Sequence, residues 1–236
     1  MNTKWTTTYH LDVFNVDHRG RANFISYFNF MQESALKHAH HLGFGSSDLL
    51  EKNLLWVVTR FELHTFSEVE WDHDVVVETW SRGLIGPYAF RDFIIKKSNG
   101  EILGKASSSW IPIDVIKRKS VALKAEDLDV ATSNDEDVGI EPRKILYKPT
   151  DDELLMSFAV RNSDLDINRH VNNTKYIQWI YDALTLEEID RMTFKNFAIN
   201  YNNEAKLGDT ITLYRKENRF VAKNQRADTI FTAEFC

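Results

Sequence analysis

Hydrophobic and polar positions along the chain repeat one pattern twice: a short alternating stretch precedes a longer stretch with apolar residues on one helical face. The alternating stretches, residues 9–16 and 154–160, are predicted strands. In the longer stretches the face positions are spaced by 4, 3 and 4 residues, which predicts one helix in each half, the second over residues 173–184. These positions are Phe24, Phe28, Met31 and Ala35 in the first half, and Asn173, Ile177, Ile180 and Leu184 in the second.

Each predicted helix is followed by runs rich in β-branched and aromatic residues, which are typical of strands. The runs cover residues 55–66, 74–81, 88–97 and 101–113 in the first half, and 194–202, 210–216, 219–223 and 228–235 in the second. Ser98-Asn99-Gly100 indicates a hairpin turn between the last two runs of the first half. We therefore predict an α+β fold in which one helix packs against an antiparallel sheet, twice over.

The two halves align as copies of one unit when Asp17 is set against Asp166, an offset of 149 residues. Asp74 matches Asp209 at the smaller offset of 135. The difference predicts that the first copy carries 14 additional residues, 40–53, between its helix and its sheet.

A strongly acidic connector separates the copies. We expect a first unit at residues 1–120, an acidic linker at 121–150 and a second unit at 151–236. Residues 125–141 contain seven Asp or Glu and no Lys or Arg, whereas the whole chain of 236 residues carries a net charge of −6. Basic residues flank this run, which is consistent with a docking surface for an acidic partner or with solvated charges beside a linker.

Composition excludes several classes of function. A hydrophobic content of 43% suffices for a buried core, no basic stripe suggests nucleic-acid binding, and no apolar run approaches the ~20 residues that span a membrane. The N-terminal stretch lacks an apolar signal core, so we expect a cytoplasmic protein. The single cysteine, Cys236, excludes an intrachain disulfide and is a poor nucleophile at a chain end. The histidines lack partners at ligand spacing, so we expect neither a metal nor a cofactor.

Candidate chemistry is concentrated in one short motif. Asp166, Asn168 and His170 occupy alternate positions just before the second predicted helix, where backbone N–H groups point outward. A carboxylate, an amide and an imidazole together supply most of what acyl transfer to water requires. The first copy has Asp17 but carries Arg19 and Arg21 at the other two positions. Asp and Asn also cap helices, so a purely structural role is the alternative for single residues.

The stretch DLDINRHVNNTKYI resembles the signature of hotdog-fold thioesterases, and specifically that of the acyl-acyl carrier protein (acyl-ACP) thioesterases of plants and bacteria. NFMQESALKHA, WVVTRFEL and NYNNEAKLGD extend the resemblance over nearly the whole chain. It implies two fused hotdog units and a thioester hydrolase that releases free fatty acid from acyl carrier protein, whose phosphopantetheine carries the acyl chain. Such a chain acts as a monomer or a homodimer.

The resemblance assigns a catalytic set of Asp166, Asn168, His170 and Glu204. Some plant members have a cysteine after the corresponding glutamate, and Ala205 at this position counts against a thiol mechanism. Asp166 then attacks the carbonyl to give a mixed anhydride or activates a water, with Asn168 orienting the carbonyl or the water. His170 would carry a proton to the departing thiolate, and Glu204 would orient its ring.

The first copy lacks the full polar set, so the resemblance implies that it binds the acyl chain. The candidate residues are Phe28, Phe30, Met31 and Trp56. An acyl-CoA thioesterase is the nearest alternative function. An enoyl-thioester hydratase is a second one, although the Asn-Pro step typical of hotdog hydratases is absent here, where Arg169 follows Asn168. A non-catalytic acyl-binding module is a third.

Overall fold

The structure is a computed structural model that describes residues 4–122, 136–191 and 196–235. The chain divides into two compact units, Met1–Pro142 and Arg143–Cys236. Among the described helices, none has both the length and the apolar character that crossing a membrane demands.

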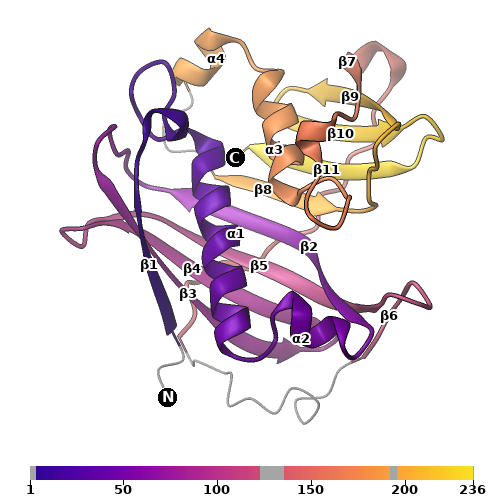
Figure 1. The fold of residues 1–236 in the computed structure, drawn as a ribbon. Coiled ribbons are helices and arrows are strands. Elements are labelled where there is room, and N and C mark those ends of the chain that lie inside the picture. Colours follow the sequence, from indigo (N-terminus) through magenta and orange to yellow (C-terminus); the bar gives the residue numbers. More distant parts are fainter. Residues whose placement is uncertain (1–3, 123–135, 192–195, 236) are drawn as a thin grey trace. The chain divides into compact units, whose positions relative to one another are not determined.

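In the first unit a long helix lies across an antiparallel sheet (Figure 1). The strands are β1 (Lys4–His10), β2 (Leu54–Thr65), β3 (Asp74–Ile85), β4 (Tyr88–Lys97), β5 (Ile102–Asp114) and β6 (Lys119–Ser120). Their order is β1-β3-β4-β5-β2, and β6 pairs with β5. Helix α1 (Phe24–His41) packs against β1 and β3, and the short helix α2 (Ser46–Leu50) packs against β2.

The second unit repeats the order of strands β1 to β5. Its strands are β7 (Leu154–Ala159), β8 (Phe197–Tyr201), β9 (Thr210–Lys216), β10 (Arg219–Asn224) and β11 (Thr229–Phe235). Their order β7-β9-β10-β11-β8 corresponds to β1-β3-β4-β5-β2 of the first unit. Helix α3 (Asn173–Asp182) packs against the sheet through Trp179, whose ring meets Phe158, and a short helix α4 (Leu186–Arg191) follows. The predicted α+β fold, with one helix against an antiparallel sheet in each copy, is confirmed.

Both long helices begin at an asparagine cap. The side chain of Asn23 accepts a hydrogen bond from Ser26 N, and that of Asn172 accepts one from Thr174 N. Each bond satisfies a backbone donor that the first helical turn leaves unpaired. The predicted helix 173–184 ends earlier, at Asp182. The buried members of the two predicted apolar faces are Phe28, Met31, Ala35, Ile177 and Ile180.

The predicted strand at residues 9–16 is wrong over most of its length. Strand β1 ends at His10, and Val13–Asn15 forms a 3₁₀ turn. Asn15 N donates to Asp12 O at 2.8 Å, and the Asn15 side chain accepts from Asp12 N at 3.2 Å. These local hydrogen bonds compete with strand pairing, which alternation of apolar residues does not reveal.

The second predicted offset between the copies is also wrong. β3 begins at Asp74 and β9 at Thr210, so the sheets match at an offset of 136 rather than 135. The turns before these strands agree, because Asp72 and Gly208 both have positive φ, 63° and 91°. The first copy therefore carries 13 extra residues, the difference between offsets 149 and 136, between its long helix and β3.

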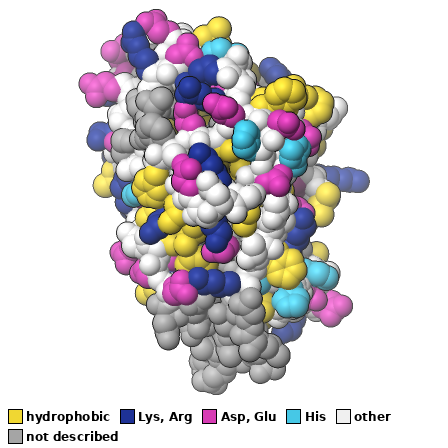
Figure 2. Space-filling view, turned by 90° about the vertical axis from the view of Figure 1, so that its left-hand side faces the viewer, with side chains coloured by type: hydrophobic (Ala, Val, Ile, Leu, Met, Phe, Trp, Pro, Cys, Tyr) yellow, Lys and Arg dark blue, Asp and Glu magenta, His cyan; other side chains and the backbone are white. Residues whose placement is uncertain are grey.

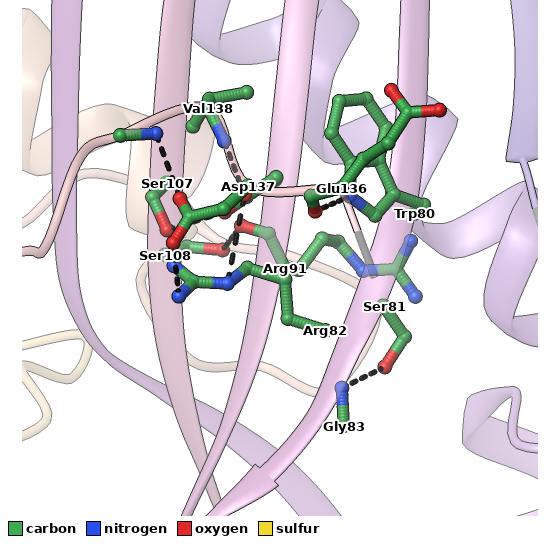
Figure 3. A network of polar contacts seen from close by, with 12 residues as sticks. Trp80, Ser81, Arg82, Gly83, Arg91, Ser107, Ser108, Glu136, Asp137 and Val138 are labelled. Atoms are coloured by element: carbon green, nitrogen blue, oxygen red, sulfur yellow. Dashed lines mark hydrogen bonds and ion pairs between the residues drawn. The ribbon is translucent and has the colours of Figure 1, made fainter. Parts of the chain in front are cut away.

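A polar network attaches the end of the connector to the first unit's sheet, on the strand face that carries Trp80 (Figure 3). Asp92 lies opposite Trp80 in the register of β3 and β4. Trp80 Nε1 donates to Glu136 O at 2.8 Å, and Val138 N donates to Asp92 Oδ2 at 3.1 Å. Arg82 pairs with Asp137 at 2.7 Å. Burial raises the pKa of Asp92. These bonds hold residues 136–138 along β3 and β4.

The rest of the expected linker is described only in part, since residues 123–135 lie outside the described residues. On the second unit's side, Asn200 of β8 accepts from Ile145 N at 2.8 Å and donates to Arg143 O at 2.9 Å. The described parts of the connector are therefore bonded to the unit to which each belongs. Figure 2 shows acidic and basic side chains interspersed over the face it draws.

A buried histidine predicts that acid destabilises the first unit. His38 on α1 is 1% exposed, and its Nδ1 lies 2.9 Å from Arg91 Nη1. Burial and the charges of Arg91 and His41 lower the pKa of His38 from 6.5 to about 4. Between these pH values the unfolded chain binds a proton that the folded chain does not, so the free energy of unfolding should fall by about 3 kcal/mol as the pH decreases. Urea unfolding at a series of pH values measures this slope.

In His38→Gln the slope should flatten between pH 6.5 and about 4, because glutamine does not titrate. His40→Gln is the matched control, since His40 is exposed on the same helix. An unchanged slope in His38→Gln would show that other groups cause the acid sensitivity.

Candidate active site

The Asp166 carboxylate organises a tight turn immediately before α3. Its Oδ1 accepts from Asn168 N at 2.8 Å and from His170 N at 3.1 Å, and Asp166 N donates to His170 O at 2.8 Å. Leu165 and Val171 form the bridge that closes the turn. Hydrogen bonds from backbone N–H groups to the Asp166 carboxylate thus hold Asp166, Asn168 and His170 in one turn.

Two groups of this turn are available for a ligand. Within the described residues, Asp166 Oδ2 makes no hydrogen bond, nor does the exposed side chain of Asn168. Arg169 adopts the left-handed conformation, with φ of 63°. This conformation is unfavourable for a residue with a side chain, and it lets the turn close between Asn168 and His170.

Glu204, in the loop after β8, lies beside His170 of this turn. Its Oε1 lies 3.8 Å from His170 Nδ1, and the two side chains are 37% and 34% exposed. The loop is bonded to the turn and the helix, because Val171 N donates to Ala205 O at 3.3 Å and Ala205 N donates to the Tyr176 hydroxyl at 3.0 Å. The structure therefore brings together all four predicted catalytic residues.

Tyr176 of α3 contacts the loop that carries Glu204, and it is not among the predicted site residues. Burial raises the pKa of Tyr176 to about 12, and the negative charges of Glu204 and Asp166 contribute to the same shift. Its phenol is therefore neutral at physiological pH. Only the long-range contact with Ala205 identifies it, and a pattern along the chain does not reveal such a contact.

The first copy contains the same turn. Asp17 Oδ1 accepts from Arg19 N at 2.9 Å and from Arg21 N at 3.1 Å, and Asp17 N donates to Arg21 O at 2.7 Å. Gly20, at the position of Arg169, has φ of 72°. The backbone is therefore the same in both copies, and the side chains differ.

The counterpart of Glu204 is Glu68. Ala22 N donates to Val69 O at 2.9 Å in the first copy, as Val171 N does to Ala205 O in the second. The predicted offset of 135 pairs Glu204 with Val69, so Glu68 has no predicted role. Both copies thus retain both carboxylates.

Two arginines replace the amide and the imidazole of the first copy. Arg19 pairs with Asp17 at 2.7 Å, and Arg21 pairs with Glu68. Burial acts to raise the pKa of Asp17, but hydrogen bonds from Arg19 and from the Arg21 backbone outweigh it, and the pKa lies below its usual range. The carboxylates of the first copy are therefore engaged in ion pairs.

The predicted acyl-binding residues lie mostly in the core of the first unit. Phe28 packs edge-on against Phe61 with ring centres 5.1 Å apart, and Phe30 stacks on Tyr9 at 4.4 Å. Met31 is fully buried, whereas Trp56 is partly exposed at the start of β2. Three of the four thus occupy core positions.

The structure tests two further residue predictions only in part. Cys236 lies outside the described residues. Within the described part of the chain, no three His, Cys, Asp or Glu side chains are grouped as they would be to hold a metal ion.

Comparisons with solved structures support the fold. An acyl-ACP thioesterase from Bacteroides thetaiotaomicron is 27% identical, with a TM-score of 0.88 over 100% of this chain and 98% of that chain. A 12:0-ACP thioesterase from Umbellularia californica is 21% identical, with a TM-score of 0.83 over 100% of this chain and 98% of that chain, and this likeness shows the fold alone. The predicted pair of hotdog units is confirmed.

Comparisons with characterised sequences and family models identify the family. The palmitoyl-acyl carrier protein thioesterase of Arabidopsis thaliana, a chloroplastic protein, is 32% identical over 75% of this chain and 46% of its own length. The chain thus spans about half the length of that relative. The acyl-ACP thioesterase N-terminal domain model matches residues 2–131, and the C-terminal domain model matches residues 147–233. The chain therefore belongs to the acyl-ACP thioesterase family.

Proposed function

We propose that this protein hydrolyses the thioester of fatty acyl groups on acyl carrier protein and releases free fatty acid. The observation that carries the proposal is the convergence of Asp166, Asn168, His170 and Glu204 in the second unit. Asp166, Asn168 and His170 belong to one turn there, Glu204 faces His170, and the family match gives that set a thioester to act on.

Asp166 is the group that acts on the acyl carbon. Its Oδ1 is held by two backbone N–H groups, so Oδ2 is presented in a fixed position. Oδ2 either attacks the carbonyl, giving a mixed anhydride as the carbon–sulfur bond breaks, or takes a proton from an attacking water. The Asn168 amide donates to the carbonyl oxygen as negative charge develops on it.

His170 carries the proton. Because Nδ1 faces Glu204 at 3.8 Å, the carboxylate favours the proton on Nδ1, and Nε2 is directed to the reacting groups. In the anhydride route the protonated ring gives a proton to the departing pantetheine thiolate, and the neutral ring then takes one from the water that hydrolyses the anhydride. In the water route the ring protonates the thiolate in the same way and then receives the proton that Asp166 took from the water. Both steps balance without a metal or a redox cofactor.

The first unit has a different role in this proposal. With Arg19 and Arg21 in place of the amide and imidazole, it lacks the groups for hydrolysis, and it encloses the acyl chain. The contribution of Phe28, Phe30 and Met31 to chain binding stays a prediction, as does that of Trp56. The oligomeric state and the cytoplasmic location also stay predictions.

Substrate preference tests the proposal. We expect kcat/KM for thiol release to be at least about 10-fold higher with acyl-ACP than with the matching acyl-CoA, because the carrier protein adds contacts that CoA lacks. Enoyl-CoA should release thiol slowly and should not gain water across its double bond. Higher kcat/KM with acyl-CoA would identify a CoA thioesterase, and hydration of enoyl-CoA would identify a hydratase. No reaction with any substrate would leave a binding module.

A further inference from the structure

We propose that Tyr176 is a positioning residue, which fixes the backbone of the Glu204 loop so that the Glu204 carboxylate faces His170. The role rests on the proposed thioesterase function. Tyr176 is not one of the four family residues, and it acts on a peptide group and not on the substrate.

The Tyr176 ring is immobilised by aromatic packing. The residue is 4% exposed, and its ring meets Trp179 edge-on at 5.1 Å, Tyr201 at 5.8 Å and Phe231 at 5.7 Å. Three neighbours from α3, β8 and β11 thus surround one ring. Since a buried ring cannot swing, the position of its hydroxyl is determined by the core of the second unit.

That hydroxyl holds the peptide group between Glu204 and Ala205. Ala205 N donates to it at 3.0 Å, and Ala205 O accepts from Val171 N at 3.3 Å. Ala205 is fully buried, so both of its backbone polar groups need partners inside the protein. Tyr176 of α3 accepts from the Ala205 N–H, and Val171 donates to the Ala205 carbonyl. Glu204 therefore begins its reach toward His170 from a fixed backbone, although its side chain is partly exposed.

The first copy shows that the tyrosine alone does not produce this bond. Tyr27 matches Tyr176 at the offset of 149 and is likewise buried. Burial raises the pKa of Tyr27, and the charge of Glu68 adds to the shift. Within the described residues, however, the Tyr27 hydroxyl does not bond to Val69 N, the counterpart of Ala205 N.

The two copies thus hold the equivalent glutamates differently. Glu68 is held at its carboxylate by the ion pair with Arg21. Glu204 must leave its carboxylate facing a histidine, and an arginine there would neutralise it. The hydrogen bond from Ala205 N to the Tyr176 hydroxyl instead fixes the loop through its backbone, and the Glu204 carboxylate takes no part in that bond.

Tyr176→Phe tests the proposal, since it keeps the ring and removes the acceptor. We expect kcat for acyl-ACP to fall about 10- to 100-fold with KM nearly unchanged, because Glu204 no longer orients His170. Tyr27→Phe is the matched control and should leave kcat unchanged. Equal losses in the two variants, or an unchanged kcat in Tyr176→Phe, would overturn the proposal.

A double-mutant cycle with Glu204→Gln tests whether Tyr176 acts through Glu204. In the Glu204→Gln background, Tyr176→Phe should cause no further loss of kcat, because the carboxylate it positions is already gone. A full additional loss would show that Tyr176 acts by another route and would overturn the positioning role.

Histidine nitrogen chemical shifts give a readout that does not depend on turnover. In uniformly ¹⁵N-labelled protein, with the His170 signal assigned by its loss in His170→Gln, Tyr176→Phe should shift the Nδ1 proton population of His170, and Tyr27→Phe should not. An unchanged His170 signal would overturn the proposal. The His170 signal could differ between the wild type and Tyr176→Phe while the wild type does not hydrolyse acyl-ACP. That result would refute the proposed function and leave the positioning role of Tyr176 intact.

Discussion

Replacing Asp166 with Asn is expected to lower kcat for acyl-ACP at least about 100-fold while the melting temperature changes little. The asparagine oxygen can still accept from Asn168 N and His170 N, so the turn before α3 is retained. What is lost is the negative charge on Oδ2, which either proposed route requires. Single-turnover measurements with acyl-ACP, together with thermal unfolding, separate the loss of chemistry from a loss of fold.

Asp17→Asn is the control for this variant, because Asp17 organises the same turn in the first copy. We expect kcat to be retained and the free energy of unfolding to fall by about 1 kcal/mol, since Arg19 loses the carboxylate it pairs with at 2.7 Å. If Asp166→Asn retained kcat, or if the two variants changed only stability and by the same amount, Asp166 would be a turn residue and the catalytic assignment would fail.

Replacing Asp92 with Ala is expected to lower the free energy of unfolding of the first unit by about 3 kcal/mol. Asp92 is fully buried and accepts from Ser107 Oγ at 2.7 Å and from Val138 N at 3.1 Å. Its removal leaves both donors without this acceptor, and Arg82, which lies 3.7 Å away and is 11% exposed, loses a negative neighbour. Urea unfolding followed by tryptophan fluorescence measures the change.

Asp137→Ala is the matched variant for this prediction. Asp137 pairs with the same Arg82, but its side chain is 47% exposed, so the pair should contribute less than about 1 kcal/mol. Equal destabilisation by the two variants would show that the buried carboxylate contributes no more than the surface one. Faster proteolysis near residues 136–142 in Asp92→Ala alone would show that Asp92 holds the connector to the sheet.

Periodicity predicted most of the fold because local spacing determines which residues can share a helix or strand face. Tyr88–Lys97 and Thr210–Lys216 have the predicted bounds. The error at residues 9–16 arose where the Asn15 side chain and the Asp12 backbone form hydrogen bonds that make a turn among apolar residues. The offset error arose because Asp74 and Asp209 are the same residue type, whereas the strands that begin at Asp74 and Thr210 are equivalent.

The candidate site was predictable only where its residues are close in the chain. Asp166 and His170 could be placed in one turn because alternate positions before a helix cap lie close together. Glu204 came from the family resemblance alone, since no local pattern links it to the turn. Tyr176 and Glu68 were missed because their roles depend on contacts between segments far apart in the sequence.

The duplicated turn has a consequence for how this chain could diverge. In a symmetric homodimer of single units, any substitution in the turn appears in both subunits, so an arginine that strengthened one would disable the other. Covalent fusion removes that constraint. One turn can then carry Arg19 and Arg21, which form ion pairs with its two acids, while the other turn carries an amide and an imidazole. Two fused units can therefore carry different side chains in their two turns, whereas the two subunits of a symmetric homodimer cannot.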